Sequence, residues 1–172
     1  DWRRDQDFDT TWEDTVLGKI AKWGSGGTPS RKIDEYFTGN IPWLKTGELG
    51  SMYVDDAEEK ITEEAILKSS AKVFPKGSVG IAMYGATIGK TSIFNAPLAT
   101  NQACAVAQPN EDIDAVFLYY YILSQKYDLI RKGQGGAQPN ISQGILKEHP
   151  ISVPKIEEQN QIVQEIEFRL SV

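Results

Sequence analysis

Short apolar runs, separated by glycine, proline and polar turn residues, dominate the first two thirds of the chain. Runs of this kind are typical of strands that are buried in a sheet. One of them is interrupted by Pro75-Lys76-Gly77, which predicts a turn directly before an apolar strand. The predicted strands lie within residues 41–49, 72–85, 92–95, 101–109 and 151–154.

Helical spacing of apolar residues marks two internal segments. Residues 60–70 predict a helix with Thr62 as N-cap, because its hydroxyl can accept a hydrogen bond from an amide of the first turn. Residues 114–132 carry the clearest helical pattern, with Asp114 as N-cap and Gly133 just beyond the end.

The last segment, residues 155–172, has apolar positions at helical spacing with charged residues between them, which predicts an amphipathic helix. We assign its apolar positions to coiled-coil packing against a partner helix. These positions are Ile156, Ile162, Val163, Ile166 and Leu170.

The elements together predict an α+β fold, in which a mixed sheet-and-helix domain is followed by the start of a long coiled-coil helix. Residues 12–23 fit either a short helix or a turn that leads into a strand, and residues 24–31 and 133–146 read as glycine-rich loops. We therefore divide the chain into a frayed terminus or fragment edge at 1–11, a globular domain at 12–154 and the helix start at 155–172.

The composition is that of an ordinary globular protein, with 40% hydrophobic and 24% charged residues in a chain of 172. No apolar run approaches the length of a membrane span, so we expect a cytoplasmic protein without membrane contact. Cys104 lies in an apolar stretch and is expected to be a buried, inert thiol, while His149 precedes a proline and is expected to be structural. With one cysteine and one histidine, we expect no metal site.

The net charge of −6 argues superficially against nucleic-acid binding, but the charges are distributed unevenly. Residues 51–64 contain six acids and one base, whereas residues 65–110 contain four lysines and no acid. A local field of this kind attracts a polyanion even when the total charge is negative.

Residues 85–91, Gly-Ala-Thr-Ile-Gly-Lys-Thr, resemble a phosphate-binding loop at first sight. Such a loop needs four residues between its two glycines and a long helix after the final threonine. Here three residues separate Gly85 from Gly89, and the stretch that follows Thr91 is β-branched, aromatic and soon broken by proline. The spacing predicts a turn between two strands in place of a nucleotide site.

Methyl-transfer motifs are also incomplete. Residues 95–98, Asn-Ala-Pro-Leu, lack the first proline and the aromatic residue of the motif that DNA amino-methyltransferases share. Gly24, Gly26 and Gly27 are followed by Thr-Pro and do not form the glycine pattern of a cofactor-binding sheet. We therefore expect no cofactor and no catalytic residue in this chain.

Four loops share a different chemistry, since they combine glycine, hydroxyl and amide side chains with a few lysines and arginines. Glycine allows a ligand to approach the backbone closely, amides and hydroxyls can read base edges, and cations can hold phosphates. One such loop is ordinary surface, but four in a small domain indicate a binding surface. They are residues 26–32, 44–49, 84–90 and 133–142.

The order and spacing of these segments resemble one family, the target-recognition domain of specificity (S) subunits of type I restriction–modification enzymes. The resemblance spans nearly the whole chain and ends in a strand, a proline and Glu158-Gln159 at the start of a helix. It rests on Trp12 to Leu17, GGTPSR (26–31), IPWLKTGEL (41–49), KITEEAILKSSAKVFPKGSV (60–79), YGATIGK (84–90), TNQACAVAQP (100–109), GQGGAQPNIS (133–142) and ISVPKIEEQNQIVQEIE (151–167).

The resemblance implies a non-catalytic domain that recognises one half of a split sequence in double-stranded DNA through the major groove. The implied partners are methyltransferase (M) subunits, a restriction (R) subunit, and a second recognition domain or S-subunit half that is reached through the spacer helix. AdoMet and ATP would belong to those partners. An ordinary S subunit has two recognition domains and two long spacer helices, so the resemblance implies a fragment or half-subunit.

Within this framework, loop residues are assigned to two tasks. Cations are assigned to phosphate contact or steering: Arg31, Lys32, Lys45, Lys76, Lys90 and Lys132. Amides and hydroxyls are assigned to base reading: Thr28, Ser30, Thr46, Tyr84, Thr87, Gln134, Gln138 and Asn140.

Two other functions remain compatible with the sequence. The chain could be a protein-interaction scaffold whose loops dock the methyltransferase while DNA is read elsewhere. It could also bind a nucleotide through residues 85–91, although the spacing argues against this function.

Overall fold

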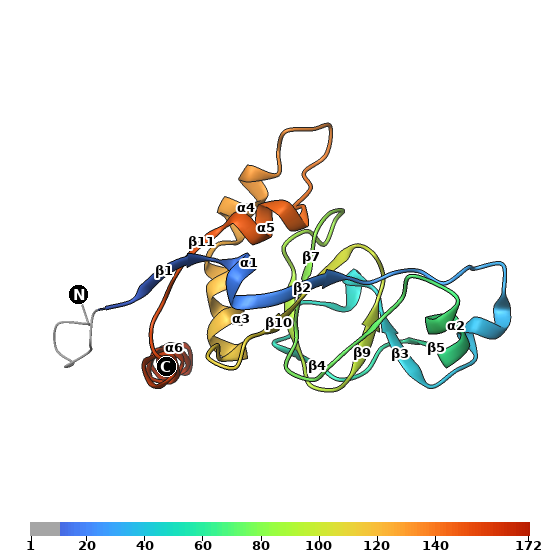
Figure 1. Ribbon diagram of the computed structural model, residues 1–172, viewed down its shortest axis with the longest axis horizontal. Helices are drawn as coiled ribbons and strands as arrows, with labels where there is room; N and C mark the ends of the chain where they lie inside the picture. Colours follow the sequence, from blue (N-terminus) through green and yellow to red (C-terminus); the bar gives the residue numbers. More distant parts are fainter. Residues whose placement is uncertain (1–10) are drawn as a thin grey trace.

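The computed structural model describes residues 11–172 and has a layered α+β architecture (Figure 1). A central five-stranded sheet carries a long helix on one face and a four-stranded sheet on the other, with a short helix beyond the second sheet. The α+β prediction is confirmed. The predicted frayed end, residues 1–11, lies outside the described residues apart from Thr11.

The five-stranded sheet is antiparallel except for one edge pair, β4 and β8, which run parallel. In spatial order it consists of β2 (Ala21–Ser25), β10 (Cys104–Pro109), β7 (Val79–Ala82), β8 (Thr91–Phe94) and β4 (Tyr53–Val54).

The four-stranded sheet contains one parallel pair, formed by β3 and β9. In spatial order it consists of β5 (Glu59–Ile61), β3 (Ile41–Leu44), β9 (Leu98–Thr100) and β6 (Val73–Phe74). A separate ribbon pairs β1 (Glu13–Val16) with β11 (Pro150–Val153) near the two ends of the domain.

Both faces of the central strands are buried, which explains why their sequences read as continuous apolar runs. In β10, Ala105 and Ala107 face the helical layer, whereas Cys104 and Val106 face the second sheet. Trp43 and Leu44 of β3 separate in the same way between the outer layer and the space between the sheets. Burial raises the pKa of the Cys104 thiol to about 12, in keeping with an inert core cysteine.

Residues 114–132 form two helices where the sequence predicts one. Asp114 caps α3 (Ala115–Ser124) by accepting a hydrogen bond from the Phe117 amide, as predicted. The chain leaves helical geometry at Gln125 and resumes as α4 (Lys126–Lys132). The Gln125 side chain is held by His149, and the break redirects α4 so that Leu129 is fully buried. This tertiary contact overrides a helical pattern that is continuous in sequence.

The shorter helices are α1 (Leu17–Ile20), α2 (Glu63–Leu67) and α5 (Gln143–Glu148), with 3-10 turns η2 (Asp34–Phe37) and η3 (Thr46–Glu48). Thr62 caps α2 by accepting the Ala65 amide, as predicted. Ser142 caps α5 in the same way by accepting the Ile145 amide.

Four strands were not predicted: β1, β4, β5 and β9. Each is at most four residues long, and β5 contains the charged pair Glu59-Lys60, so local periodicity is too short or too polar to reveal them. Residues 12–23 form strand, helical turn and strand, and neither predicted alternative describes them fully.

Helix α6 (Ile156–Leu170) is fastened to the domain by buried polar side chains in its first turn. Gln159 is fully buried, and its amide group accepts a hydrogen bond from the Asp114 amide at 2.8 Å. Its nitrogen donates to the carbonyl oxygens of Asp112 (2.9 Å) and Pro154 (3.0 Å). Glu158 accepts a hydrogen bond from the Trp12 indole at 2.9 Å. These bonds fix the direction in which α6 leaves the domain.

We expect Gln159→Leu to lower the free energy of unfolding by about 2–4 kcal/mol, because it leaves one backbone amide and two carbonyls unpaired in the interior. Gln164→Leu on the exposed side of the same helix is the matched control and should change stability by less than about 0.5 kcal/mol. Urea unfolding measures both. Equal losses in the two variants would show that the buried bonds do not hold α6.

His149 is 2% exposed and connects α4, α5 and the start of the β11 strand. The Lys132 ammonium can only donate, so Nδ1 of His149 accepts its hydrogen bond at 2.9 Å. Nε2 therefore carries the hydrogen and donates to Oε1 of Gln125 at 2.9 Å. Burial lowers the pKa of His149, and the Lys132 charge lowers it further, while Asp128 opposes both. The histidine is structural, as predicted, and is neutral in the folded protein at neutral pH.

Stability should fall as the pH drops below about 6.5, the ordinary histidine pKa, because the unfolded chain then binds a proton that folded His149 resists. This loss should continue until the pH passes the lowered pKa of the folded state. His149→Gln keeps a hydrogen-bonding side chain without titration, so its stability should change less between pH 8 and pH 5.5. Chemical unfolding across this range measures the difference, and parallel curves would contradict the assignment.

Candidate nucleic-acid interface

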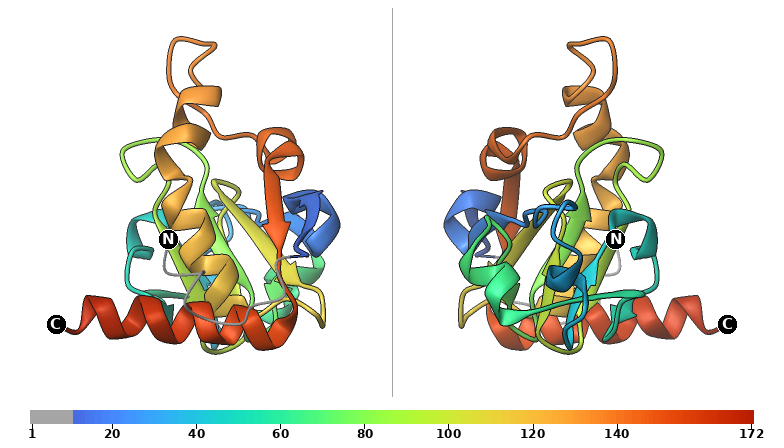
Figure 2. Two further views of the ribbon diagram at one scale, coloured as in Figure 1. Left: turned by 90° about the vertical axis from the view of Figure 1, so that its left-hand side faces the viewer. Right: turned by 90° about the vertical axis from the view of Figure 1, so that its right-hand side faces the viewer.

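Two of the four predicted loops, residues 84–90 and 133–142, lie together and are called the paired loops below. The Ile141 amide donates to the Met83 carbonyl at 2.7 Å, and Tyr84 forms an antiparallel bridge with Asn140. The Asn140 amide closes the second loop by donating to the Gly133 carbonyl at 3.1 Å. The paired loops form one end of the molecule, opposite α6 (Figure 2).

Residues 84–90 are a tight turn that joins the antiparallel strands β7 and β8. Gly85 and Gly89 both have φ of +81°, a conformation that side chains rarely tolerate. The amides of Ile88, Gly89 and Lys90 donate to carbonyl oxygens within the turn or in β7. These amides are therefore already paired, unlike those of a loop that wraps a phosphate.

The second loop projects beyond the body of the domain (Figures 1 and 2) and exposes three amide side chains, Gln134, Gln138 and Asn140. A hollow of about 250 Å³ lies where this loop meets the β7–β8 turn. It is lined by Gly85, Ala86, Ile88, Gln138 and Pro139. Tyr84 is 38% exposed beside it, and Thr87 is half-buried.

Lys126, which was not predicted as a site residue, belongs to the same surface. Its side chain lies directly over Gly89: a β-carbon at position 89 would come within 2.9 Å of the Lys126 Cγ and Cε atoms. The unpredicted helix break at Gln125 places Lys126 there, so the helical pattern of residues 114–132 gave no signal for it. Lys90 extends past Gly50 on the other side of the turn.

The cations near the paired loops differ in their pairing. Arg131 and Lys132 both bind Asp128, and Lys132 also donates to His149. Within residues 11–172, no carboxylate lies within 4.0 Å of the Lys90 or Lys126 ammonium. These two lysines therefore present uncompensated positive charge.

The loop at residues 26–32 lies elsewhere, near the end of the molecule that carries α2 and β5 (Figure 1). Arg31 forms a bidentate pair with Glu59, at 2.6 and 3.1 Å, and its guanidinium lies 4.3 Å from the centre of the Phe37 ring. The Arg31 hydrogen bonds hold the pKa of the Glu59 carboxyl below its usual value, and Lys45 contributes through a second hydrogen bond. The acidic run at 55–59 thus neutralises two of the predicted phosphate contacts.

The remaining predicted residues are scattered. Thr46 is only 9% exposed, which limits its access to a base, and Thr28 donates to Gln102. Ser30 and Lys32 are exposed in the same loop. Lys76 occupies the turn before β7, at the opposite end of that strand from Tyr84. The structure therefore brings together Tyr84, Thr87, Lys90, Lys132, Gln134, Gln138 and Asn140, and separates them from the others.

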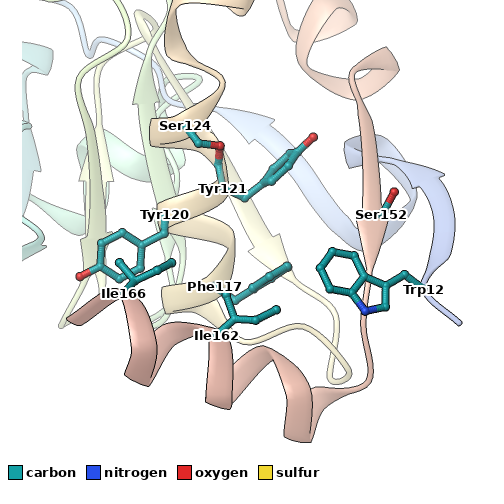
Figure 3. A pocket seen from close by; sticks show the side chains of 8 residues that line it. All are labelled: Trp12, Phe117, Tyr120, Tyr121, Ser124, Ser152, Ile162 and Ile166. Atoms are coloured by element: carbon teal, nitrogen blue, oxygen red, sulfur yellow. The ribbon is translucent and has the colours of Figure 1, made fainter. Parts of the chain in front are cut away.

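A second surface lies between α3, α6 and the β1–β11 ribbon. It is an open, mainly apolar groove of about 400 Å³, in which Trp12, Phe117 and Tyr120 face Ile162 and Ile166 of α6 (Figure 3). Further along α6, Phe168 is 67% exposed and Leu170 is 71% exposed. Three residues assigned to a partner helix, Ile162, Val163 and Ile166, pack on the domain's own core, and half-buried Ile156 lies in the first turn.

Within residues 11–172, no group of three or more histidine, cysteine, aspartate or glutamate side chains is placed to hold a metal ion. None of the helices in the same part of the chain combines the length and apolar character that a membrane span needs.

The chain is similar in sequence to two specificity subunits of type I restriction enzymes. The chain is 37% identical over 155 residues to the EcoR124I/EcoR124II specificity subunit of Escherichia coli, covering 87% of this chain and 38% of that protein. It is 32% identical over 178 residues to the MjaIX specificity subunit of Methanocaldococcus jannaschii, covering 94% and 41%. The chain thus spans about two fifths of the length of these relatives.

Solved structures share the fold at lower identity. The HsdS subunit from Thermoanaerobacter tengcongensis matches with a TM-score of 0.71 and 21% identity, over 94% of this chain and 38% of that one. The S subunit from M. genitalium matches with a TM-score of 0.62 and 16% identity, over 94% and 42%. A model of the family described as "Type I restriction modification DNA specificity domain" matches residues 9–167. The chain therefore belongs to the family of type I restriction–modification DNA specificity domains.

Proposed function

We propose that this chain recognises one half of a split sequence in double-stranded DNA, as the recognition domain of a type I specificity subunit, and that it does so without catalysis. The observation that carries this proposal is the pair of adjoining loops at one end of the fold. They contain no acidic residue and expose amide and hydroxyl groups; the unpaired cation Lys90 ends the first loop, and the unpaired Lys126 lies against it. This combination suits contact with base edges and with phosphates.

The shape of the second loop supports this function. The B-DNA major groove is about 12 Å wide and admits one projecting element of secondary structure. Residues 134–139 project as a single loop whose base is fixed by the Tyr84–Asn140 bridge. Because the two ends of the loop are already fixed in the free protein, less conformational entropy is lost when the loop enters a groove.

The end of the molecule that carries α6 is the proposed place for the partner subunits. Methyltransferase and restriction subunits, together with a second recognition domain or S-subunit half, would assemble on the end that carries α6. The exposed Phe168 and Leu170 and the apolar groove beside α3 favour a protein partner there. A spacer role for α6 fits the buried bonds of Glu158 and Gln159, which fix its direction.

The same groove supports the alternative function, a scaffold that docks the methyltransferase while DNA is read elsewhere. The two functions use opposite ends of the molecule (Figure 2). Loss of DNA binding without loss of methyltransferase co-purification, in variants of the paired loops, would separate them. Nucleotide binding by residues 85–91 is disfavoured, because the amides of Ile88, Gly89 and Lys90 are already paired with carbonyl oxygens.

Lys90→Ala and Lys126→Ala should each weaken binding to DNA of any sequence. Each substitution removes about one phosphate contact, so the slope of log affinity against log salt should become shallower by roughly 0.9. Fluorescence anisotropy with a labelled duplex, titrated at several salt concentrations, measures this slope.

Lys19→Ala is the matched control, since Lys19 is an exposed lysine of α1, on the other side of the domain from the β7–β8 turn (Figure 2). It removes the same charge and should leave the slope unchanged. An equal change of slope in all three variants would mean that DNA binding depends only on the total charge of the protein. That result would contradict the assignment of the paired loops to DNA contact.

A further inference from the structure

The hollow between the paired loops has one polar side chain and an otherwise apolar lining. Gln138 contributes an amide, while Ala86, Ile88 and Pro139 contribute carbon surface, and Gly85 leaves one side open. No described residue forms a hydrogen bond with the Gln138 side chain, so its donor and acceptor are both available to a ligand. The side chains of this hollow can therefore distinguish one base pair from another, beyond binding DNA of any sequence.

An amide complements one base edge better than the others. In the major groove, adenine presents the N7 acceptor beside the N6 donor, and a glutamine amide can satisfy both at once. Guanine presents two acceptors, N7 and O6, which a cationic side chain satisfies best. The hollow is lined by no cation, and the nearby Arg131 is bound to Asp128.

The apolar part of the hollow complements the other base of the same pair. Thymine carries a C5 methyl group in the major groove, and cytosine has only a hydrogen there. Ala86, Ile88 and Pro139 offer carbon surface close to the Gln138 amide. An amide and an apolar hollow side by side therefore match adenine and the thymine methyl of one A·T pair, or of adjacent pairs.

We propose that the paired loops read an A·T base pair, with Gln138 bound to adenine and the hollow formed by Ala86, Ile88 and Pro139 in contact with the thymine methyl group. This inference rests on the proposed DNA-recognition function and names the base pair that one part of the surface selects.

The test is selection of bound duplexes from a randomised DNA pool, followed by sequencing, with the 172-residue chain and its variants. Wild type should enrich a sequence that contains at least one fixed A·T pair. Gln138→Ala should relax the preference at that pair by roughly 10-fold or more and leave other enriched positions intact. Gln138 is exposed, so this substitution does not threaten folding.

Two changes make the assignment sharper. Gln138→Arg should shift the preference at the same position from adenine to guanine, because its guanidinium can bind N7 and O6 together. Replacing thymine by uracil at the selected pair removes the methyl group and should weaken wild-type binding about 3- to 4-fold. Gln164→Ala is the matched control, since Gln164 is an exposed glutamine of α6, at the opposite end of the molecule from the paired loops.

The outcomes distinguish this inference from the function on which it rests. If wild type enriches a sequence, but Gln138→Ala and Gln164→Ala both leave every A·T position unchanged, the base-pair assignment is wrong and DNA recognition stands. Loss of the preference in both variants would also contradict the role of the hollow. If wild type enriches no sequence at all, both the proposed DNA-recognition function and the A·T assignment are contradicted.

Discussion

One backbone contact determines where the candidate surface lies: the hydrogen bond from the Ile141 amide to the Met83 carbonyl, continued by the Tyr84–Asn140 bridge. Met83 directly follows β7 in the centre of the larger sheet, and Ile141 is fully buried. A long glycine-rich loop is thereby fastened to the rigid sheet at its base while its tip remains exposed. Without this contact, Gln138 and the β7–β8 turn would have no defined relation to each other.

The fold could be predicted from sequence wherever local chemistry decides the structure. The capping residues Thr62 and Asp114 and the buried apolar runs all predicted their elements. Prediction failed where tertiary contacts decide. The break at Gln125 depends on its bond to His149, 24 residues further along the chain. Strand β5 depends on pairing with β3, because its own residues include Glu59 and Lys60.

The candidate site could be predicted only in part, for the same reason. Glycine-rich loops with amides and lysines pointed to residues 84–90 and 133–142, and the structure brings these segments together. Sequence alone could not show that Arg31 and Lys45 are neutralised by an acidic run some 13 to 28 residues away. Nor could it show Lys126 over Gly89, because that contact joins two elements far apart in the chain.

The most direct test of the central claim, that DNA meets the paired loops, is photocrosslinking to duplexes that the chain selects from a randomised pool. A photoreactive phenylalanine analogue would be placed at position 138 or, in a separate variant, at position 31. Both positions are exposed on loops, but only position 138 belongs to the paired loops. Crosslinks to DNA from position 138 and none from position 31 are predicted. Crosslinks from position 31 alone would place the DNA on the other surface and contradict the account.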